Sequence, residues 1–116
     1  DRFWLDGPLS INAYEQLDFL EQLYQLRLHF QPKNQKIVIK ILEKTPLVNG
    51  LLSGKTGSHY KGGEFQFGWF VGHIQSDNRQ YVVVVNAKGK GAAGSKLKEL
   101  LMRLLPKIID KTVLAQ

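Results

Sequence analysis

The segment LLSGKTGSHYKGGEFQFGWFVGHI, residues 51–74, decides the fold of the second half of this chain. Residues 51–58 are predicted to form a strand, and HYKGGE, residues 59–64, to form a hairpin loop that contains Gly62 and Gly63. In residues 65–74 large apolar side chains alternate with small or polar ones, which is the period of a strand with two different faces. The segment therefore predicts an antiparallel hairpin whose first strand carries a lysine and three hydroxyl side chains.

Two helices are predicted before this hairpin. Ser10 or Asn12 can cap the first helix, and Asn12 with Glu15 has the spacing of a capping box. Pro32 can open a second, shorter helix, which Pro46 and the VNG after it are expected to end. The predicted buried face of the first helix consists of Ala13, Leu17, Leu20, Leu23 and Tyr24. That of the second consists of Ile37, Val38, Ile41 and Leu42.

The chain after the hairpin predicts a third strand and a final helix. The apolar run in QYVVVVN, residues 80–86, favours a strand that is covered on both faces. The apolar stripe of the final helix consists of Leu97, Leu100, Leu101, Leu104, Leu105 and Ile108. The predicted fold class is α/β in the broad sense and α+β in layout. Two helices precede a three-stranded antiparallel meander, and a C-terminal helix covers the sheet.

Length and N-terminal sequence bound the domain organisation. A chain of 116 residues can build one modest core but not two. The opening DRFWLDGPLSI places Phe3 and Trp4, which favour burial, almost at the first residue. We therefore interpret the N-terminus as a cut end, and residues 1–116 are predicted to be a single incomplete domain.

The residue types that the chain lacks exclude several classes of site. It has no cysteine, which excludes a disulfide scaffold, a zinc–thiolate centre and a cysteine nucleophile. His29, His59 and His73 are far apart and have no partners at ligand spacing, so no metal site is expected. No apolar run approaches the roughly 18 residues of a membrane span. The net charge of +6 admits a small basic nucleic-acid-binding domain as a remote alternative.

The triplet KTG is the strongest chemical signal in the chain. On a strand, Lys55 and Gly57 point to one face and Thr56 to the other. At a sheet edge, Gly57 would let a ligand approach the backbone closely, while Lys55 supplies a positive charge. The hydroxyls of Thr56 and Ser58 add donors, so the group could bind a small carboxylate or a developing oxyanion. The alternative is a solvent-facing lysine that protects an exposed edge from aggregation.

The order KTG, hairpin and GWFVGHI is similar to the third signature of the penicillin-recognising serine enzymes, in which K-T-G accompanies S-x-x-K. FWLDGPLSI and NAYEQLDFLEQLY narrow the resemblance to class D (oxacillinase-type) β-lactamases and the related penicillin-sensor domains. The resemblance covers nearly the whole chain and corresponds to about the C-terminal half of such a domain. It implies that the nucleophilic serine lies upstream of Asp1. It implies the same for the lysine that carbon dioxide converts into a carbamate.

This resemblance implies roles for the residues around the triplet. Lys55 would support substrate binding and proton movement, and the side chains of Thr56 and Ser58 would help to hold the β-lactam carboxylate. The backbone N–H of Ser58 would be one of two oxyanion-hole donors. Gly57 would keep the strand clear of the acyl group.

The resemblance also implies roles outside the triplet. Trp4 matches the tryptophan that donates its indole N–H to the lysine carbamate, and Leu5 would lie beside it at the pocket. The arginine that grips the substrate carboxylate in many class D enzymes has no counterpart in AKGKGAAGSKLK, where Lys96 or Lys98 could replace it. No cofactor is expected on this chain.

The implied function is hydrolysis of β-lactam antibiotics by serine acylation and deacylation, in a periplasmic or secreted protein. This chain alone is predicted to be inactive, because the nucleophile would lie on other chain. The alternative is a penicillin sensor that acylates without turnover, since the same motifs serve both. The expected partners are a β-lactam and the N-terminal half of the same domain, not nucleic acid or a membrane. A homodimer is left open.

Overall fold

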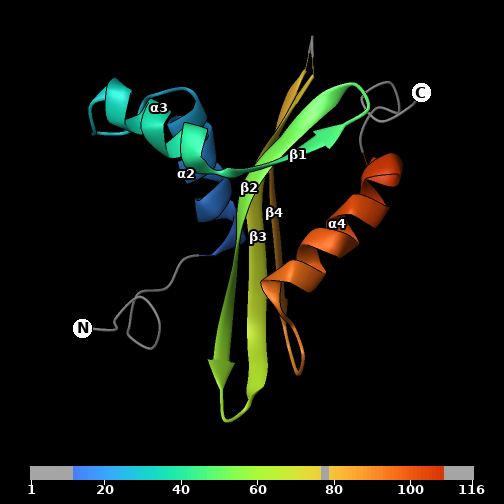
Figure 1. The fold of residues 1–116 in the computed structure, drawn as a ribbon. Helices are drawn as coiled ribbons and strands as arrows, with labels where there is room; N and C mark the ends of the chain where they lie inside the picture. Colours follow the sequence, from blue (N-terminus) through green and yellow to red (C-terminus); the bar gives the residue numbers. More distant parts are fainter. Residues whose placement is uncertain (1–11, 77–78, 109–116) are drawn as a thin grey trace.

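The structure, a computed structural model, describes residues 12–76 and 79–108. Its core is a single antiparallel sheet in which the four strands follow one another in the order β1-β2-β3-β4. The elements are α2 (Ala13–Tyr24), α3 (Pro32–Ile41), β1 (Glu43–Leu47), β2 (Gly50–Lys61), β3 (Glu64–Ser76), β4 (Gln80–Lys88) and α4 (Gly94–Ile108). Helices lie on both sides of the sheet, with α2 and α3 on one side and α4 on the other (Figure 1). The predicted α+β layout is confirmed, but the sheet has four strands rather than three.

The hairpin of β2 and β3 is longer and its turn tighter than the sequence suggested. The two strands pair from Gly50↔Ser76 to Lys61↔Glu64, so that only Gly62 and Gly63 form the loop. Both glycines have positive φ, 63° and 81°, which is the conformation that two-residue hairpin turns require. The register shifts between His59 and Tyr60, and this irregularity lies beyond the KTG triplet.

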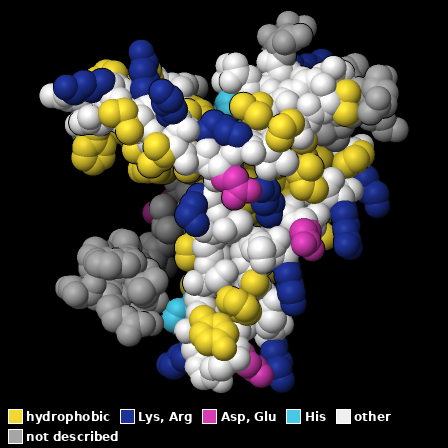
Figure 2. All heavy atoms as spheres, in the orientation of Figure 1, with side chains coloured by type: hydrophobic (Ala, Val, Ile, Leu, Met, Phe, Trp, Pro, Cys, Tyr) yellow, Lys and Arg dark blue, Asp and Glu magenta, His cyan; other side chains and the backbone are white. Residues whose placement is uncertain are grey.

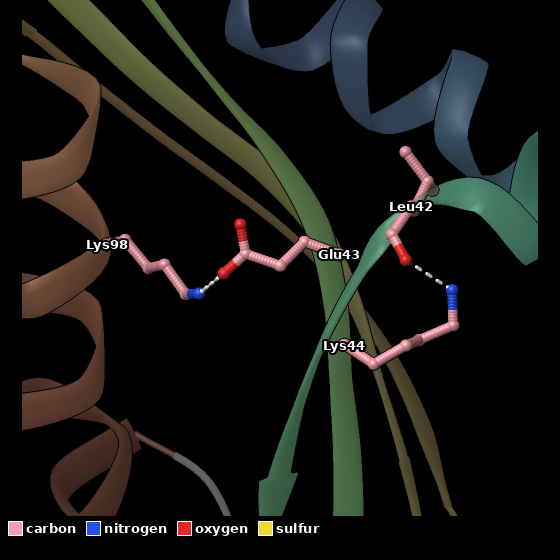
Figure 3. A network of polar contacts seen from close by, with 4 residues as sticks. All are labelled: Leu42, Glu43, Lys44 and Lys98. Carbon is pink, nitrogen blue, oxygen red and sulfur yellow. Dashed lines mark hydrogen bonds and ion pairs between the residues drawn. The ribbon is translucent and has the colours of Figure 1, made fainter.

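Strand β1 is the element that the sequence prediction missed. The second helix ends at Ile41, and β1 then pairs with β2 from Glu43↔Gly54 to Leu47↔Gly50. The ammonium group of Lys44 helps to end the helix, because it donates to the carbonyls of Ile39 and Lys40 at 2.8 and 3.2 Å. It also donates to the Leu42 carbonyl at 2.5 Å (Figure 3). Pro46 is tolerated in β1 because β1 is an edge strand.

Helix α4 covers one face of the sheet and completes the hydrophobic core. Leu101 and Leu105 pack against Leu52, Phe70 and Ile74, all nearly or fully buried. Of the predicted stripe, Leu97, Leu101 and Leu105 are buried, whereas Leu100 and Leu104 are 43% and 38% exposed. Leu97, Leu101 and Leu105, four residues apart along α4, therefore face the sheet. Leu100 and Leu104 lie on the neighbouring helix face, at the border with solvent.

Helix α2 packs on the opposite face of the sheet. Asn12 caps it through the predicted capping box, accepting from the Glu15 N–H at 2.8 Å, while the Glu15 carboxylate accepts from the Asn12 N–H at 3.3 Å. Leu20 and Leu23 are buried as predicted. Tyr24, the last residue of the helix, reaches the sheet itself. Strand β4 therefore has a helix on each face, although its valines are only half-buried because β4 is an edge strand.

The prediction that the apolar face of α3 is buried is wrong. Ile37, Val38 and Ile41 are 55%, 43% and 75% exposed, and hydrophobic and lysine side chains lie next to one another over this helix (Figure 2). The buried residue of α3 is Gln35, whose side-chain amide bonds the backbone of Leu28 and Phe30. Polar contacts to the preceding turn therefore hold α3, because no apolar layer covers it within the described residues.

Among the helices of residues 12–76 and 79–108, none combines the length and the apolar character needed to cross a bilayer.

Candidate functional site: the open edge of strand β2

The KTG triplet begins where the sheet edge opens. Strand β1 pairs with β2 only as far as Gly54, the residue immediately before Lys55. From Lys55 to Lys61, strand β2 has a neighbouring strand on the β3 side alone within the described part of the chain. Backbone N–H and C=O groups on the other side of this segment are thus free of sheet pairing and can meet a ligand. The length of β1 therefore determines where a binding edge is available.

The triplet has the predicted alternation of faces. Thr56 pairs with buried Phe70, and the Ser58 hydroxyl touches the start of α4, so both lie on the α4 side of the sheet. Lys55 and Gly57 lie on the opposite side, which is the side of α2. Lys55 is exposed, and its ammonium group donates to the Thr56 carbonyl oxygen at 2.7 Å. The lysine charge is therefore held at the edge of the sheet.

Gly57 is a position at which a side chain does not fit. A Cβ atom there would lie 2.0 Å from Cε2 and 2.1 Å from Cζ2 of Trp69, its cross-strand partner. The indole of Trp69 thus lies directly over the Gly57 backbone. It continues into a stacked pair with Phe67, whose ring centroid is 5.6 Å away, and Phe67 stacks in turn on His59 at 5.3 Å. An aromatic strip therefore runs from the triplet toward the hairpin turn.

The beginning of α4 rests on the backbone of the triplet strand. The Gly94 N–H donates to Ser58 Oγ at 2.8 Å. A Cβ atom on Gly94 would meet the Gly57 carbonyl oxygen at 2.5 Å, and one on Gly68 would meet the Gly94 nitrogen at 2.7 Å. Gly68 and Gly94 thus let the helix rest on the strand backbone, including that of Gly57, with no side chain between them, and the Ser58 hydroxyl caps α4.

An ion pair places a second cation near Lys55. Lys98 of α4 reaches across to Glu43 of β1, to which its ammonium group is hydrogen-bonded (Figure 3). This contact, and secondarily the charge of Lys98, lowers the pKa of the Glu43 carboxyl below its ordinary value, and Lys55 contributes in the same direction. Lys96 is exposed and extends toward the loop at Gly91. Of the two lysines suggested by the sequence, Lys98 is the one that reaches toward the sheet edge.

The spacing S-x-x-K occurs twice in the chain, at Ser58–Lys61 and at Ser95–Lys98. In neither pair is the serine hydroxyl bonded to its lysine: Ser58 Oγ accepts from the Gly94 N–H, and Lys98 bonds Glu43. Ser58 and Lys61 are three residues apart on a strand and point to opposite faces. Ser95 is exposed in the first turn of α4, and the ammonium group of Lys98 is ion-paired with Glu43. The expectation that the nucleophile lies upstream of Asp1 therefore rests on the family resemblance and remains a prediction.

Two of the predicted site residues, Trp4 and Leu5, lie outside the described residues. Within residues 12–76 and 79–108, no three His, Asp or Glu side chains gather in a way that could hold a metal ion.

Glu43 is the site residue that the sequence interpretation missed. It was overlooked because residues 43–47 were assigned to the end of a helix. The dipeptide Asn49–Gly50 was the available signal, since such a pair between two extended segments is typical of a hairpin.

Taken together, the described residues at the open edge present groups suited to binding an anion, and none of their serine hydroxyls is bonded to a general base. Lys55 supplies positive charge, with the ion-paired Lys98 close by. The N–H groups of β2 beyond Gly54, which no described strand pairs on that side, supply donors at the same edge. The hydroxyls of Ser53, Ser58 and Ser76 are bonded to Tyr24, to the Gly94 N–H and to the Arg79 backbone, none of which is a general base poised for them.

Comparison with known proteins agrees with this description. Residues 1–106 match the penicillin-binding protein transpeptidase domain, and the chain belongs to that family. It is 35% identical to the probable β-lactamase YbxI of Bacillus subtilis over 92% of this chain and 38% of YbxI. It is 33% identical to the regulatory protein BlaR1 of Bacillus licheniformis over 90% of this chain and 18% of BlaR1. The solved class D β-lactamase BAT-2 superimposes with a TM-score of 0.80 at 34% identity, over 91% of this chain and 43% of BAT-2. The chain thus spans less than half the length of these relatives.

Proposed function

We propose that this chain forms the K-T-G wall of a class D-type serine β-lactamase, and that the assembled domain hydrolyses β-lactam antibiotics by acylation and deacylation. The observation that carries the proposal is the KTG triplet at the point where the edge of β2 opens, in a chain related to class D enzymes. Residues 1–116 would be one part of an incomplete domain. The other part would supply the nucleophilic serine and the lysine that becomes a carbamate, and this chain alone would be inactive. The assembled protein would act in the periplasm or be secreted.

In this proposal the described residues bind and orient the substrate. Lys55 attracts the substrate carboxylate and stabilises negative charge that develops during acylation. The N–H of Ser58 donates to the oxyanion, and Thr56 holds the carboxylate from the neighbouring position. Trp4 would contact the carbamate, because an indole N–H is a donor only and a carbamate oxygen is an acceptor. Leu5 would line the pocket beside it.

We propose Lys98 as the first candidate, and Lys96 as the second, for the cation that replaces the class D arginine. Replacing Lys98 by methionine in the assembled domain is expected to raise KM for a penicillin about three- to tenfold, since a charge-assisted bond is lost. The same change at Lys96 is expected to leave KM within about twofold. Steady-state kinetics at two salt concentrations would measure both. A larger effect at Lys96 than at Lys98 would assign the role to Lys96 instead.

A second candidate function is penicillin sensing without turnover. It is favoured by the similarity to the regulatory protein BlaR1. The lifetime of the acyl adduct separates the two functions, because an enzyme must release the product on the timescale of its turnover. An adduct that persists for many minutes would support the sensor, and loss within seconds would support the hydrolase.

The first test of the proposed function is intact mass spectrometry after brief exposure to a penicillin. Alone, this chain of 13.2 kDa is expected to gain no drug mass. Mixed with the complementary part of a class D domain, it is expected to form a complex under native conditions. In that complex the complementary part, and not this chain, should carry the adduct. An adduct on this chain would contradict the proposal. Native spectra would also report a homodimer.

A further inference from the structure

A polar cluster joins α2 to the sheet away from the open edge. The rings of Tyr24 and His73 are stacked, with centroids 4.0 Å apart and an angle of 9° between their planes. The Tyr24 hydroxyl and Ser53 Oγ are 2.7 Å apart, and His73 Nε2 lies 3.1 Å from Gln80 Oε1. Tyr24, at the end of α2, therefore contacts Ser53 of β2 and His73 of β3, and His73 in turn bonds Gln80 of β4.

The imidazole of His73 is buried yet lies next to solvent-accessible space. Its exposed fraction is only 5%. Two hollows, of about 190 and 340 Å³, are lined by both Tyr24 and His73. A proton can therefore reach the imidazole without unfolding of the chain, although the charge it creates would lie in a poorly solvated position.

We propose that the Tyr24–His73 stack is a pH-sensitive latch, which holds α2 on the sheet near neutral pH and loosens it when His73 gains a proton. Protonation places the charge on a buried imidazole ring packed against Tyr24, and it requires Nε2–H to donate to Gln80 Oε1. The titratable or charged groups around the same hollows are Glu21, Tyr24, Lys36, Lys44 and Tyr81. Because two lysines and only one carboxylate are among them, a positive charge on the His73 imidazole is electrostatically disfavoured.

The sign of the pH dependence follows from burial. Burial lowers the pKa of the His73 imidazole, and the hydrogen bond to Gln80 offsets this only in part. A base whose pKa is depressed when α2 is docked binds a proton more readily when α2 is released. Docking is therefore fully favoured above the ordinary histidine value of 6.5 and is lost as the pH falls toward the depressed pKa.

The latch is linked to the candidate site through β2. Ser53 is two residues before Lys55 and lies on the same face of the strand. Helix α2 also follows directly after the segment that contains Trp4 and Leu5 in the sequence. Loosening of α2 would thus affect the neighbourhood of the triplet, but the latch itself is independent of the proposed activity.

Amide hydrogen exchange and NMR titration of the labelled chain test this inference. Protection factors of α2 amides are expected to fall at least about threefold from pH 7.5 to 5.5 relative to those of α4, because the helix opens locally. His73→Phe keeps a stacking ring that cannot titrate, and it should remove this loss. His59→Phe is the matched control, because His59 also stacks on an aromatic ring, Phe67, and this variant should behave as the wild type.

Two results would overturn the latch. One is an equal loss of α2 protection in wild type and His73→Phe. The other is an imidazole of His73 that titrates at or above the ordinary histidine value in the wild type. The second measurement needs no variant, so the inference stays testable even where His73→Phe fails to fold.

Discussion

Replacing Lys55 by alanine in the assembled domain is expected to lower kcat/KM for a penicillin at least about a hundredfold. The ammonium group of Lys55 is held beside the Thr56 carbonyl, at the first residue of β2 that β1 leaves unpaired. Its removal takes away a fixed positive charge from the edge at which the substrate carboxylate and the oxyanion would bind. Steady-state hydrolysis of a chromogenic β-lactam would measure the effect.

Lys61→Ala is the matched control for Lys55→Ala. Lys61 is an exposed lysine at the far end of the same strand, and its loss should change kcat/KM by less than about twofold. Near-normal hydrolysis by Lys55→Ala, with the protein still folded, would remove Lys55 from the mechanism and weaken the assignment of the whole edge.

Replacing Gly57 by alanine is expected to cost both stability and activity. The new methyl group would lie 2.0 Å from Trp69 Cε2, far inside van der Waals contact, so the indole or the strand must move. Overpacking of this kind costs about 1–3 kcal/mol of unfolding free energy. Urea unfolding followed by tryptophan fluorescence would measure the loss, and acylation of the assembled domain should slow in parallel.

A double variant tests whether the stability cost of Gly57→Ala comes from overpacking against Trp69 or from another effect of a side chain at position 57. Trp69→Leu removes the ring that the methyl group would strike, so Gly57→Ala should cost less stability in that background than in the wild type. Equal costs in the two backgrounds would mean that the Trp69 contact does not explain the glycine.

The parts of the fold that were predicted correctly are those specified by short stretches of sequence, such as helix caps, hairpin turns and strand alternation. The capping box of Asn12 and Glu15 fixed the beginning of α2, and Gly62 with Gly63 marked the hairpin turn. The alternation of faces across the triplet followed from the strand period alone. In each case a short-range rule and the tertiary structure favour the same conformation, so no other information was needed.

Long-range contacts account for what the sequence did not reveal. The boundary between α3 and β1 depends on Lys44 binding helix carbonyls and on β1 pairing with β2, and neither shows in the apolar pattern of residues 37–42. The pairing of Glu43 with Lys98 joins residues far apart in the chain. The predicted roles of Lys55, Thr56, Gly57 and Ser58 depend on a ligand and remain predictions.

The contact of Gly57, Gly68 and Gly94 bears on how the binding edge can diverge between related proteins. Backbone touches backbone at this contact, so a side chain at position 68 or 94 would push α4 away from the triplet strand. Substitution of these two glycines should therefore be rare, and the backbone contact between α4 and β2 should be conserved among related proteins. New ligand preferences would arise instead at positions with exposed side chains, such as Glu43 at the end of the edge and Phe67 on the aromatic strip. A selection for altered substrate range should accumulate substitutions there and spare the glycines.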